Sequence, residues 1–468
     1  MRQTISFDNS YARLPDRMFT QLSPTSVKTP ELITVNRDLA AVLGIDPDMP
    51  DATGIFAGNT IPEGAAPLSQ VYAGHQFGNW NPQLGDGRAV LLGEVIGTDG
   101  LRRDIQLKGS GPTPYSRNGD GRAWLGPVLR EYLVSEAMHA MGVPTTRALA
   151  AVTTGEQVYR EEILPGAIIT RTAQSHIRVG TFQYFASRGD IEALSALTDH
   201  VIARHYPDAD GPAALLDNVI RNYATLIAKW MGLGFIHGVM NTDNVSIAGE
   251  TIDYGPCAFI DAFHPDMVFS AIDQFGRYAY SNQPKIGAWN MAQFATSLIP
   301  LMPDQDAAIK DFTAAVYRFP PLYEQAWLMQ FRAKLGLTDA QENDTTLIND
   351  LLNLMAKDQA DFTNVFAKLG TSDARDQFVN RDHFDQWNTA WQARNPDLAL
   401  MRHTNPKIIP RNHRVEAVIS AARTGDFKPF HRLLDAVTQP YADLNDDTGH
   451  FSKAPTTDEK VMRTFCGT

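Results

Sequence analysis

Cysteine is almost absent from this chain of 468 residues, which contains only Cys257 and Cys466. Two cysteines cannot complete a zinc site alone, and neither belongs to a Cys-x-x-Cys pair. Cys257 lies two residues past Gly255, and Cys466 lies two residues from the end of the chain. Spacing alone leaves two alternatives open, namely two unrelated reduced thiols or one pair.

Long apolar runs are absent as well. No stretch approaches 18 uninterrupted apolar residues, so the sequence predicts no membrane span and no membrane partner. Residues 1–8 lack the apolar core of a signal peptide and already include Asp8. These features favour a cytoplasmic protein.

An excess of positive charge is the third feature that the chain lacks. The formal net charge is -12, and a protein that binds nucleic acid needs a basic face. The composition therefore disfavours nucleic acid as a partner. A basic pocket inside an acidic chain is still compatible with this balance, and a nucleotide site would require one.

The residues that are present suffice for a large core. Hydrophobic residues make up 43% of the chain and charged residues 20%, as in ordinary globular proteins. Strand signals dominate up to about residue 190 and helix signals follow, which predicts an α+β fold with two lobes. We expect an N-terminal extension over residues 1–70, a strand-rich lobe over 71–188, a helical lobe over 189–410, and C-terminal helices with a loose tail over 411–468.

Turn and cap residues predict several individual elements. Residues 89–96 and 104–108 predict a hairpin that turns at Thr98-Asp-Gly100. Residues 31–43 predict a helix that ends at Gly44, and a second helix is expected from Pro127 to Gly142. Two further strands are expected over 145–153 and 167–172, joined around Gly155.

One polar loop stands out. The segment His237-Gly-Val-Met-Asn-Thr-Asp-Asn244 places a carboxylate beside a carboxamide, and Asp253-Tyr-Gly255 follows nine residues later. Residues 245–253 between them predict a short hairpin with its turn at Ala248-Gly249. Protein kinases use the same order, in which an Asn and an Asp hold the metal on the nucleotide phosphates. The usual catalytic Asp of a kinase is absent, because the position two after His237 is Val239.

The chemistry of this loop suggests specific roles. Asp243 can accept a proton from an attacking hydroxyl, and Asn244 and Asp253 offer oxygen ligands to Mg²⁺. The alternative is a capped turn, because Asn-Thr-Asp-Asn is also typical turn sequence. His176 and His237 are more readily explained as structural residues than as general bases.

Four charged residues upstream fit a phosphate site. Lys108 at the end of a predicted strand and Glu131 on the next predicted helix resemble the ion pair of kinases, in which the lysine holds phosphates. Arg171 and Arg178 are predicted to converge from a strand and the loop after it. The alternatives are a solvated Lys–Glu pair and two surface arginines.

A repeated tetrapeptide adds a weaker signal. Gly85-Asp-Gly-Arg88 and Gly119-Asp-Gly-Arg122 share one pattern. Glycines let backbone amides approach an anion, and arginine adds a bidentate contact. The alternative is a pair of ordinary Asp-Gly turns.

Taken together, these stretches resemble the selenoprotein O family of adenylylating pseudokinases, also called protein nucleotidyltransferases. The matching stretches cover most of residues 70–260 and the C-terminus. They are Tyr72-Ala-Gly-His-Gln-Phe-Gly, Gln83-Leu-Gly-Asp-Gly-Arg-Ala, Gln106-Leu-Lys-Gly-Ser-Gly-Pro-Thr-Pro-Tyr-Ser-Arg, Arg130-Glu-Tyr-Leu-Val-Ser-Glu-Ala-Met, Ser175-His-Ile-Arg-Val-Gly-Thr-Phe, the loop His237–Asn244, Ile252-Asp-Tyr-Gly-Pro and Cys466-Gly-Thr.

The resemblance implies a protein-kinase-like fold in which ATP binds in reversed orientation, so that AMP moves to Ser, Thr or Tyr hydroxyls of proteins. It implies Asp243 as the base and Asn244 with Asp253 as ligands of Mg²⁺ or Mn²⁺. It also implies a set of ATP-binding residues, namely Gly85, Gly87, Arg88, Lys108, Asp120, Gly121, Arg171, Arg178 and Asp253, with Glu131 supporting Lys108.

Cys466 stands where many eukaryotic members of this family carry selenocysteine. Because Cys257 follows the metal loop and Cys466 lies in the tail, we expect a reversible, regulatory disulfide between them. Two other functions remain open at this point. One is an ordinary protein phosphotransferase, and the other is a nucleotide-binding pseudokinase scaffold without catalysis.

Overall fold

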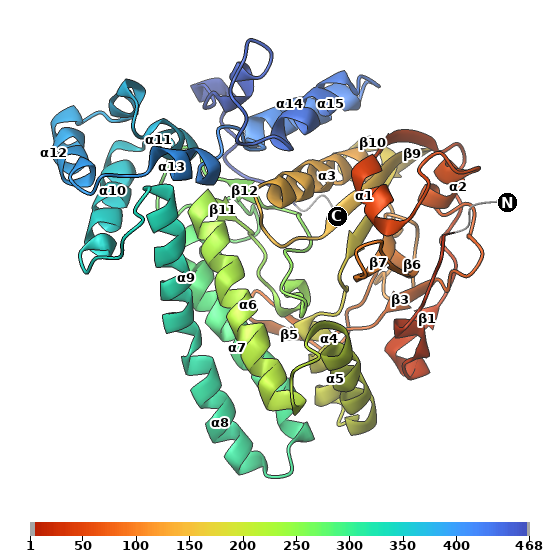
Figure 1. Cartoon of the computed structure of the whole chain (residues 1–468). Helices are drawn as coiled ribbons and strands as arrows, with labels where there is room; N and C mark the ends of the chain where they lie inside the picture. Colours follow the sequence, from red (N-terminus) through yellow and green to blue (C-terminus); the bar gives the residue numbers. More distant parts are fainter. Residues whose placement is uncertain (1–4, 466–468) are drawn as a thin grey trace.

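The computed structural model describes residues 5–465, in which strands lie mainly in the first part of the chain and helices in the rest (Figure 1). The fold is α+β, as the sequence predicts. The strands are β1 Phe19–Gln21, β2 Glu31–Val35, β3 Leu68–Gln70, β4 Gly74–Gln76, β5 Asn79–Asn81, β6 Ala89–Ile96, β7 Arg102–Lys108, β8 Ala123–Trp124, β9 Arg147–Tyr159, β10 Ile163–Ala173, β11 Phe235–Ile236 and β12 Ala258–Phe259.

The main sheet is antiparallel. Its order is β1-β3-β6-β7-β10-β9-β2, and β8 pairs with β10. Strands β6 and β7 form the expected hairpin, with Ala89 opposite Lys108. β10 lies between β7 and β9, and its Arg171 is opposite Gln106 of β7. The centre of the sheet thus places Lys108 and Arg171 on neighbouring strands.

Two short helices lie near the N-terminus of the described residues, and the longer helix α3 packs on the sheet. The helices are α1 Arg37–Leu43, α2 Ala52–Ala57, α3 Leu125–Ala140, α4 Val179–Ser187, α5 Ile191–His205, α6 Gly211–Leu233, α7 Gln283–Leu298, α8 Gln305–Tyr317, α9 Phe319–Lys334, α10 Asp344–Asp358, α11 Phe362–Lys368, α12 Arg381–Gln392, α13 Leu398–Thr404, α14 Asn412–Ala422 and α15 Lys428–Val437. None of these helices is both long and apolar enough to cross a membrane.

Apolar side chains cover both faces of the sheet. α3 packs on β9 and β10, and α14 and α15 pack on α3 (Figure 1). Leu91 of β6 belongs to the large core that continues into α3 and the helices, whereas the next residue, Leu92, belongs to a smaller core with α1 and α2. Because side chains alternate along a strand, β6 contributes to both cores. The N-terminal residues therefore shield the face opposite α3.

Two local predictions are wrong in their details. Residues 31–43 do not form one helix, because residues 31–35 are strand β2 on the edge of the sheet beside β9. The helix begins only at Arg37, after Asn36 accepts a hydrogen bond from the backbone of Leu39 at 3.0 Å, and it ends at Gly44 as expected. Gly155 does not join two strands. It lies inside β9, opposite an irregularity in the pairing with β10, and the strands turn at residues 160–162.

The hairpin expected over residues 245–253 is also absent from the described residues. Ser246 instead bridges to Arg178, and Thr251 bridges to Thr145. The backbone of the loop thus bonds mainly to distant segments, apart from a turn in which Gly249 N donates to the backbone oxygen of Ser246 at 3.2 Å. The tail is not loose throughout either, since Thr464 is buried and bridges to Ser270.

Candidate active site

Asp253 is the centre of a buried charge cluster. Its Oδ1 accepts from Lys108 Nζ at 2.8 Å and from Arg171 Nη1 at 2.7 Å, and its Oδ2 accepts from Arg178 Nη1 at 2.5 Å. Burial alone would raise the pKa of Asp253, but Lys108, Arg178 and Arg171 hold it well below its ordinary value. The carboxylate is therefore ionised at neutral pH.

Glu131 on α3 is the second carboxylate of the cluster. It accepts from Lys108 Nζ at 2.7 Å and from Arg171 Nη1 at 2.8 Å. Burial opposes ionisation, yet the two cations keep the pKa of Glu131 below its ordinary value. Three cations thus converge with these two carboxylates, and converging guanidinium and ammonium groups suit a polyanion such as a triphosphate.

Different elements position these side chains. Lys108 ends β7, Arg171 lies within β10, and Arg178 is the N-cap of α4. Arg171 Nε also donates to Gln106 Oε1 at 2.9 Å, which fixes the guanidinium across the strand pair. The structure therefore brings together Lys108, Glu131, Arg171, Arg178 and Asp253, the five charged residues that the sequence grouped.

Asp243 lies in a short 3₁₀ turn, Thr242–Asn244, beside this cluster. Arg178 Nη1 donates to the backbone oxygen of Asp243 at 2.6 Å, so one arginine contacts both Asp243 and Asp253. The Oδ2 atom of Asp243 accepts from Gln76 Nε2 at 3.0 Å, and its buried Oδ1 has no hydrogen-bond partner in residues 5–465. Burial raises the pKa of Asp243 to about 6.

Asn244 presents a carboxamide next to Asp243. Its Nδ2 donates to the backbone oxygen of Val239 at 2.9 Å, so the amide orientation is fixed. The carboxamide oxygen accepts no hydrogen bond within the described part of the chain. It is a hard oxygen donor of the kind that Mg²⁺ and Mn²⁺ prefer, and it is available.

The glycines of the two tetrapeptides have a packing role. A Cβ at Gly85, whose φ is 137°, would lie 2.4 Å from Tyr115 Cγ, and one at Gly121, whose φ is 64°, would lie 2.1 Å from the carbonyl carbon of Gly111. At Gly87 the nearest atom would be the Tyr115 backbone oxygen at 2.7 Å. These glycines let the connector after β7 fold closely over residues 85–88.

Arg88 and Asp120, the two remaining predicted nucleotide contacts, differ in whether their side chains already have partners. Arg88 is half-buried, and its guanidinium has no hydrogen-bond or ion-pair partner among residues 5–465. Asp120 instead pairs with Arg160 at 2.8 Å and accepts from the backbone of Arg122 at 2.9 Å. No contact in the described part joins Asp120 to the cluster around Asp253.

Three further residues contact the site, but the sequence predicted no role for them because no local motif marks them. Gln76 contacts Asp243, as described above. Asp86 is buried, accepts from Gln106 Nε2 at 3.1 Å and lies 3.9 Å from Arg178. The Tyr72 ring lies 4.8 Å from the Arg178 guanidinium. All three lie within stretches that carry the family resemblance, which is the one signal that could have identified them.

The predicted structural histidines make structural contacts. His176 Nδ1 lies 2.9 Å from Asp104 Oδ2, and His237 Nε2 lies 2.9 Å from the backbone oxygen of Ile252. His237 therefore holds the residue before Asp253 in place. Cys257 is buried, whereas Cys466 lies outside the described residues.

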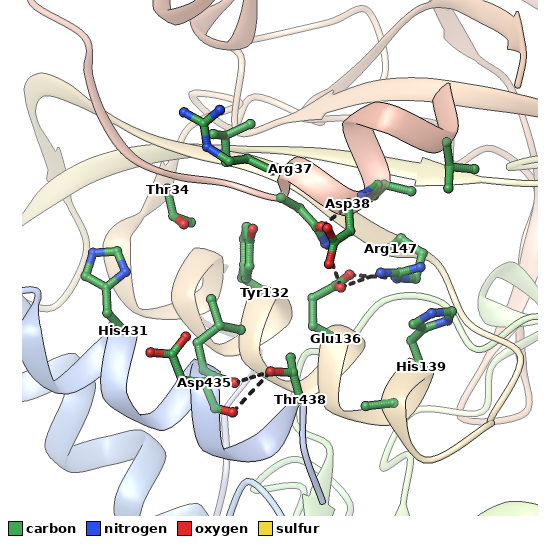
Figure 2. A pocket seen from close by; sticks show the side chains of 16 residues that line it. Thr34, Arg37, Asp38, Tyr132, Glu136, His139, Arg147, His431, Asp435 and Thr438 are labelled. Carbon is green, nitrogen blue, oxygen red and sulfur yellow. Dashed lines mark hydrogen bonds and ion pairs between the residues drawn. The ribbon is translucent and has the colours of Figure 1, made fainter. Parts of the chain in front are cut away.

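A large cavity of about 610 Å³ lies elsewhere, where α1, α3, β9 and α15 meet (Figure 2). Glu136 projects toward it from α3 and pairs with Arg147 of β9 at 2.6 Å (Figure 2). Glu131, the residue of α3 that joins the charge cluster, is not among its lining residues. The cavity is thus separate from the chemistry around Asp253.

A family model described as "Protein adenylyltransferase SelO" matches residues 1–438. The chain belongs to the SelO family. The resemblance of the motifs is thereby confirmed.

Relatives of the SelO family match along their entire length. The chain is 61% identical to a protein nucleotidyltransferase YdiU of Roseobacter denitrificans over 474 residues, covering 100% of each chain. It is 58% identical to the protein of the same name from Ruegeria pomeroyi, and 54% identical to that from Methylorubrum populi, again over 100% of each chain.

Proposed function

We propose that this member of the SelO family is a protein adenylyltransferase, which moves AMP from ATP to Ser, Thr or Tyr hydroxyls of proteins. The observation that supports this most directly is Arg178, which links the ion-paired Asp253 to the loop of Asp243. A cationic site for phosphates and a carboxylate of raised pKa thus adjoin each other.

The triphosphate would bind to the cations of the cluster. Lys108, Arg171 and Arg178 are held in place by two carboxylates, and Arg88 offers a further guanidinium without a partner in the described residues. Gly85, Gly87 and Gly121 would let backbone amides approach the phosphates. Asp120 remains a proposed contact of the nucleotide, although it would have to exchange its pairing with Arg160 to reach it.

A divalent cation fits the oxygen donors here. Asn244 and Asp253 would hold Mg²⁺ or Mn²⁺, since one provides an available carboxamide oxygen and the other an ionised carboxylate. Within residues 5–465 no group of three His, Cys, Asp or Glu could hold a metal alone. The remaining ligands would therefore be phosphate oxygens and water. The bound metal would neutralise phosphate charge.

Asp243 would act as the general base. A carboxylate whose pKa is about 6 is ionised at neutral pH and can still accept a proton. The acceptor hydroxyl would lose its proton to Asp243 while its oxygen bonds to the α-phosphorus. The bond from that phosphorus to the bridging oxygen breaks, and pyrophosphate leaves with the bonding electrons.

The same arrangement of strand lysine, helix glutamate and Asp-Tyr-Gly supports a kinase-like fold. We propose that residues 71–188 and 189–410 are its two lobes, that 1–70 and 411–468 are extensions, and that the protein acts in the cytoplasm. An ordinary phosphotransferase is disfavoured by Val239, which occupies the position of the usual kinase base.

Labelled ATP tests the assignment. The protein is incubated with Mg²⁺ or Mn²⁺, protein acceptors and ATP that carries the label on either the α or the γ phosphate. Retention of the α label alone supports AMP transfer. Retention of the γ label would indicate phosphorylation, and retention of neither would indicate a binding scaffold.

We also propose that Cys257 and Cys466 form a reversible disulfide. Thr464, two residues before Cys466, donates from Oγ1 to the backbone oxygen of Pro256 at 2.6 Å. Its backbone nitrogen donates to Phe269 at 2.7 Å, and its oxygen accepts from Ala271 at 3.0 Å. These bonds hold the tail beside the residue that precedes Cys257.

A further inference from the structure

A cavity of about 540 Å³ opens between the β4–β5 hairpin and the segment that leads into α7. Phe77 lies on the hairpin side, Ile272, Phe275 and Arg277 on the segment, and Lys285 on α7. None of these residues belongs to the charge cluster around Asp253. We refer to this cavity as the hairpin groove.

The hairpin groove lies directly beside the proposed base. Gln76, which donates to Asp243 Oδ2, is the neighbour of Phe77 in the chain. Phe77 N and Tyr278 Oη both donate to Asn241 Oδ1, at 3.0 and 2.6 Å. Asn241 precedes Asp243 by two residues. The hairpin and the segment that leads into α7 are therefore both hydrogen-bonded to the loop that carries the base.

Two of the side chains that line the groove are cations, Arg277 and Lys285. Neither Arg277 nor Lys285 has an ion-pair partner in the part of the chain that the structure describes. The carboxylate of Asp273, which also lines the groove, is already satisfied, because its oxygens accept from the backbone of Arg277 at 2.9 Å and of Tyr278 at 2.7 Å. The groove thus presents two cations against one carboxylate, on a chain whose net charge is -12.

The Arg277 guanidinium is packed against neighbouring side chains. Its guanidinium carbon lies 4.8 Å from the centre of the Trp289 ring, and a Cβ on Gly78 would approach it to 3.4 Å. Its Nε and Nη2 atoms are buried and unsatisfied within residues 5–465. The guanidinium lines the groove, where its positive charge attracts a carboxylate.

Two exposed apolar side chains flank these cations. Phe275 is 97% exposed and Ile272 is 61% exposed. Large apolar side chains that extend this far from a surface beside an active site are typical of contacts with another protein. The tail bonds to the same segment, because Ala271 N donates to the backbone oxygen of Thr464 at 3.0 Å.

We propose that the hairpin groove binds the acceptor protein through a segment that carries an Asp or Glu within a few residues of the modified hydroxyl. The acidic side chain would pair with Arg277 and Lys285, and an apolar neighbour would pack on Phe275 and Ile272. This inference rests on the proposed AMP transfer and adds to it a preference for acidic acceptor sequences.

A peptide library tests the preference. Each peptide holds one Ser, Thr or Tyr, with Asp, Ala or Lys at the flanking positions, and AMP transfer is followed from ATP labelled on the α phosphate. The wild-type protein should modify the Asp peptides with a kcat/KM about tenfold above that of the Lys peptides. Arg277→Glu combined with Lys285→Glu should reverse this order, whereas the affinity for ATP stays the same.

Two further variants separate docking from folding. Lys285→Glu alone changes an exposed side chain and should reduce the preference in part. Phe275→Ala should raise KM for all peptides, because it removes apolar contact without altering charge. Lys310→Glu on α8 is the matched control, since Lys310 is an exposed lysine with no ion-pair partner in residues 5–465, and it should change nothing.

The outcomes distinguish the two proposals. Transfer by the wild type without an acidic preference, or a preference that survives charge reversal, would overturn the groove proposal and leave AMP transfer standing. Labelling of extract proteins but of no peptide would also overturn it, because a groove that recognises local sequence must act on a free segment. No α label on any acceptor would refute the proposed function and the groove with it.

Discussion

At the scale of single residues, the conformation of Asp253 shows how strongly the site is organised. Its φ is 62°, in the left-handed region that L residues rarely adopt. This conformation costs about 1–2 kcal/mol for residues other than glycine, although Asp tolerates it better than most. Ion pairs with Lys108, Arg171 and Arg178 offset that cost and hold the carboxylate in its position.

Replacing Asp253 by Ala should abolish metal-dependent AMP transfer. The loss of a metal ligand that acts on phosphates removes several kcal/mol of charge stabilisation, which corresponds to about a thousandfold or more in rate. Label transfer at saturating ATP measures the effect. Near-normal turnover of Asp253→Ala would remove this residue from the metal site.

Asp243 gives a prediction about pH. A base works only when ionised, and the pKa of Asp243 in the folded protein is raised to about 6. The rate of transfer should therefore fall as the pH decreases through about 6. Gln76 donates to the carboxylate and so lowers its pKa, and Gln76→Ala should move the midpoint of the pH–rate profile to higher pH. A midpoint that stays unmoved in this variant would argue against Asp243 as the titrating base.

Residue type and order could predict part of this site but not all of it. Lys108, Glu131 and Asp253 were recognisable because charged residues of these kinds followed one another in the order of a known site. Gln76 and Asp86 could not be recognised from the residues alone. Gln76 contacts a residue that is 167 positions away, and no local pattern encodes such a contact.

At the scale of elements, predictions succeeded where local partners were sufficient. The β6–β7 hairpin was predictable because its two strands are neighbours in the chain and pair with each other. Residues 245–253 show the opposite case, since their alternating pattern suited a hairpin but the partners are Arg178 and Thr145. Tertiary pairing thus overrode local preference. Gly155 was misinterpreted as a turn because glycine also marks an irregularity within a strand.

Glu136 on α3 joins three elements, and its loss should destabilise the fold. Its carboxylate accepts from Arg147 of β9 (Figure 2), from Asn36 at the start of α1 and from the backbone of Ala148. Glu136→Ala should lower the free energy of unfolding by about 3 kcal/mol, because it leaves Arg147 mostly buried without a partner. Urea denaturation measures this loss. Asp48→Ala, which breaks an exposed pair with Arg37, should have almost no effect.

At the scale of the whole molecule, Arg411 ties the C-terminal helices to the body. It is fully buried and pairs with Asp361 at 2.8 Å and with Asp261, and it donates to the backbone oxygen of Ser452 at 3.0 Å. Arg411→Ala should cost about 3 kcal/mol of stability and expose the residues after α13 to proteases. Limited proteolysis with mass analysis follows the cleavage. The exposed Arg423, which pairs with Glu162, provides the control, and equal cleavage in Arg423→Ala and Arg411→Ala would contradict the role of Arg411.

The proposed disulfide would connect the C-terminal tail to the segment that follows Asp253. Bonds from Thr464 to Pro256, Phe269 and Ala271 already hold the tail against the segment between Asp253 and the hairpin groove. A bond between Cys257 and Cys466 would fix that tail and restrict entry of an acceptor protein. The oxidised protein should therefore migrate as a separate species on a non-reducing gel, and a reductant should increase AMP transfer. Cys466→Ser should lose both responses while its transfer rate matches that of the reduced wild type. If both thiols can be alkylated after mild oxidation, or if Cys466→Ser still responds to reductant, the tail does not regulate the site through this bond.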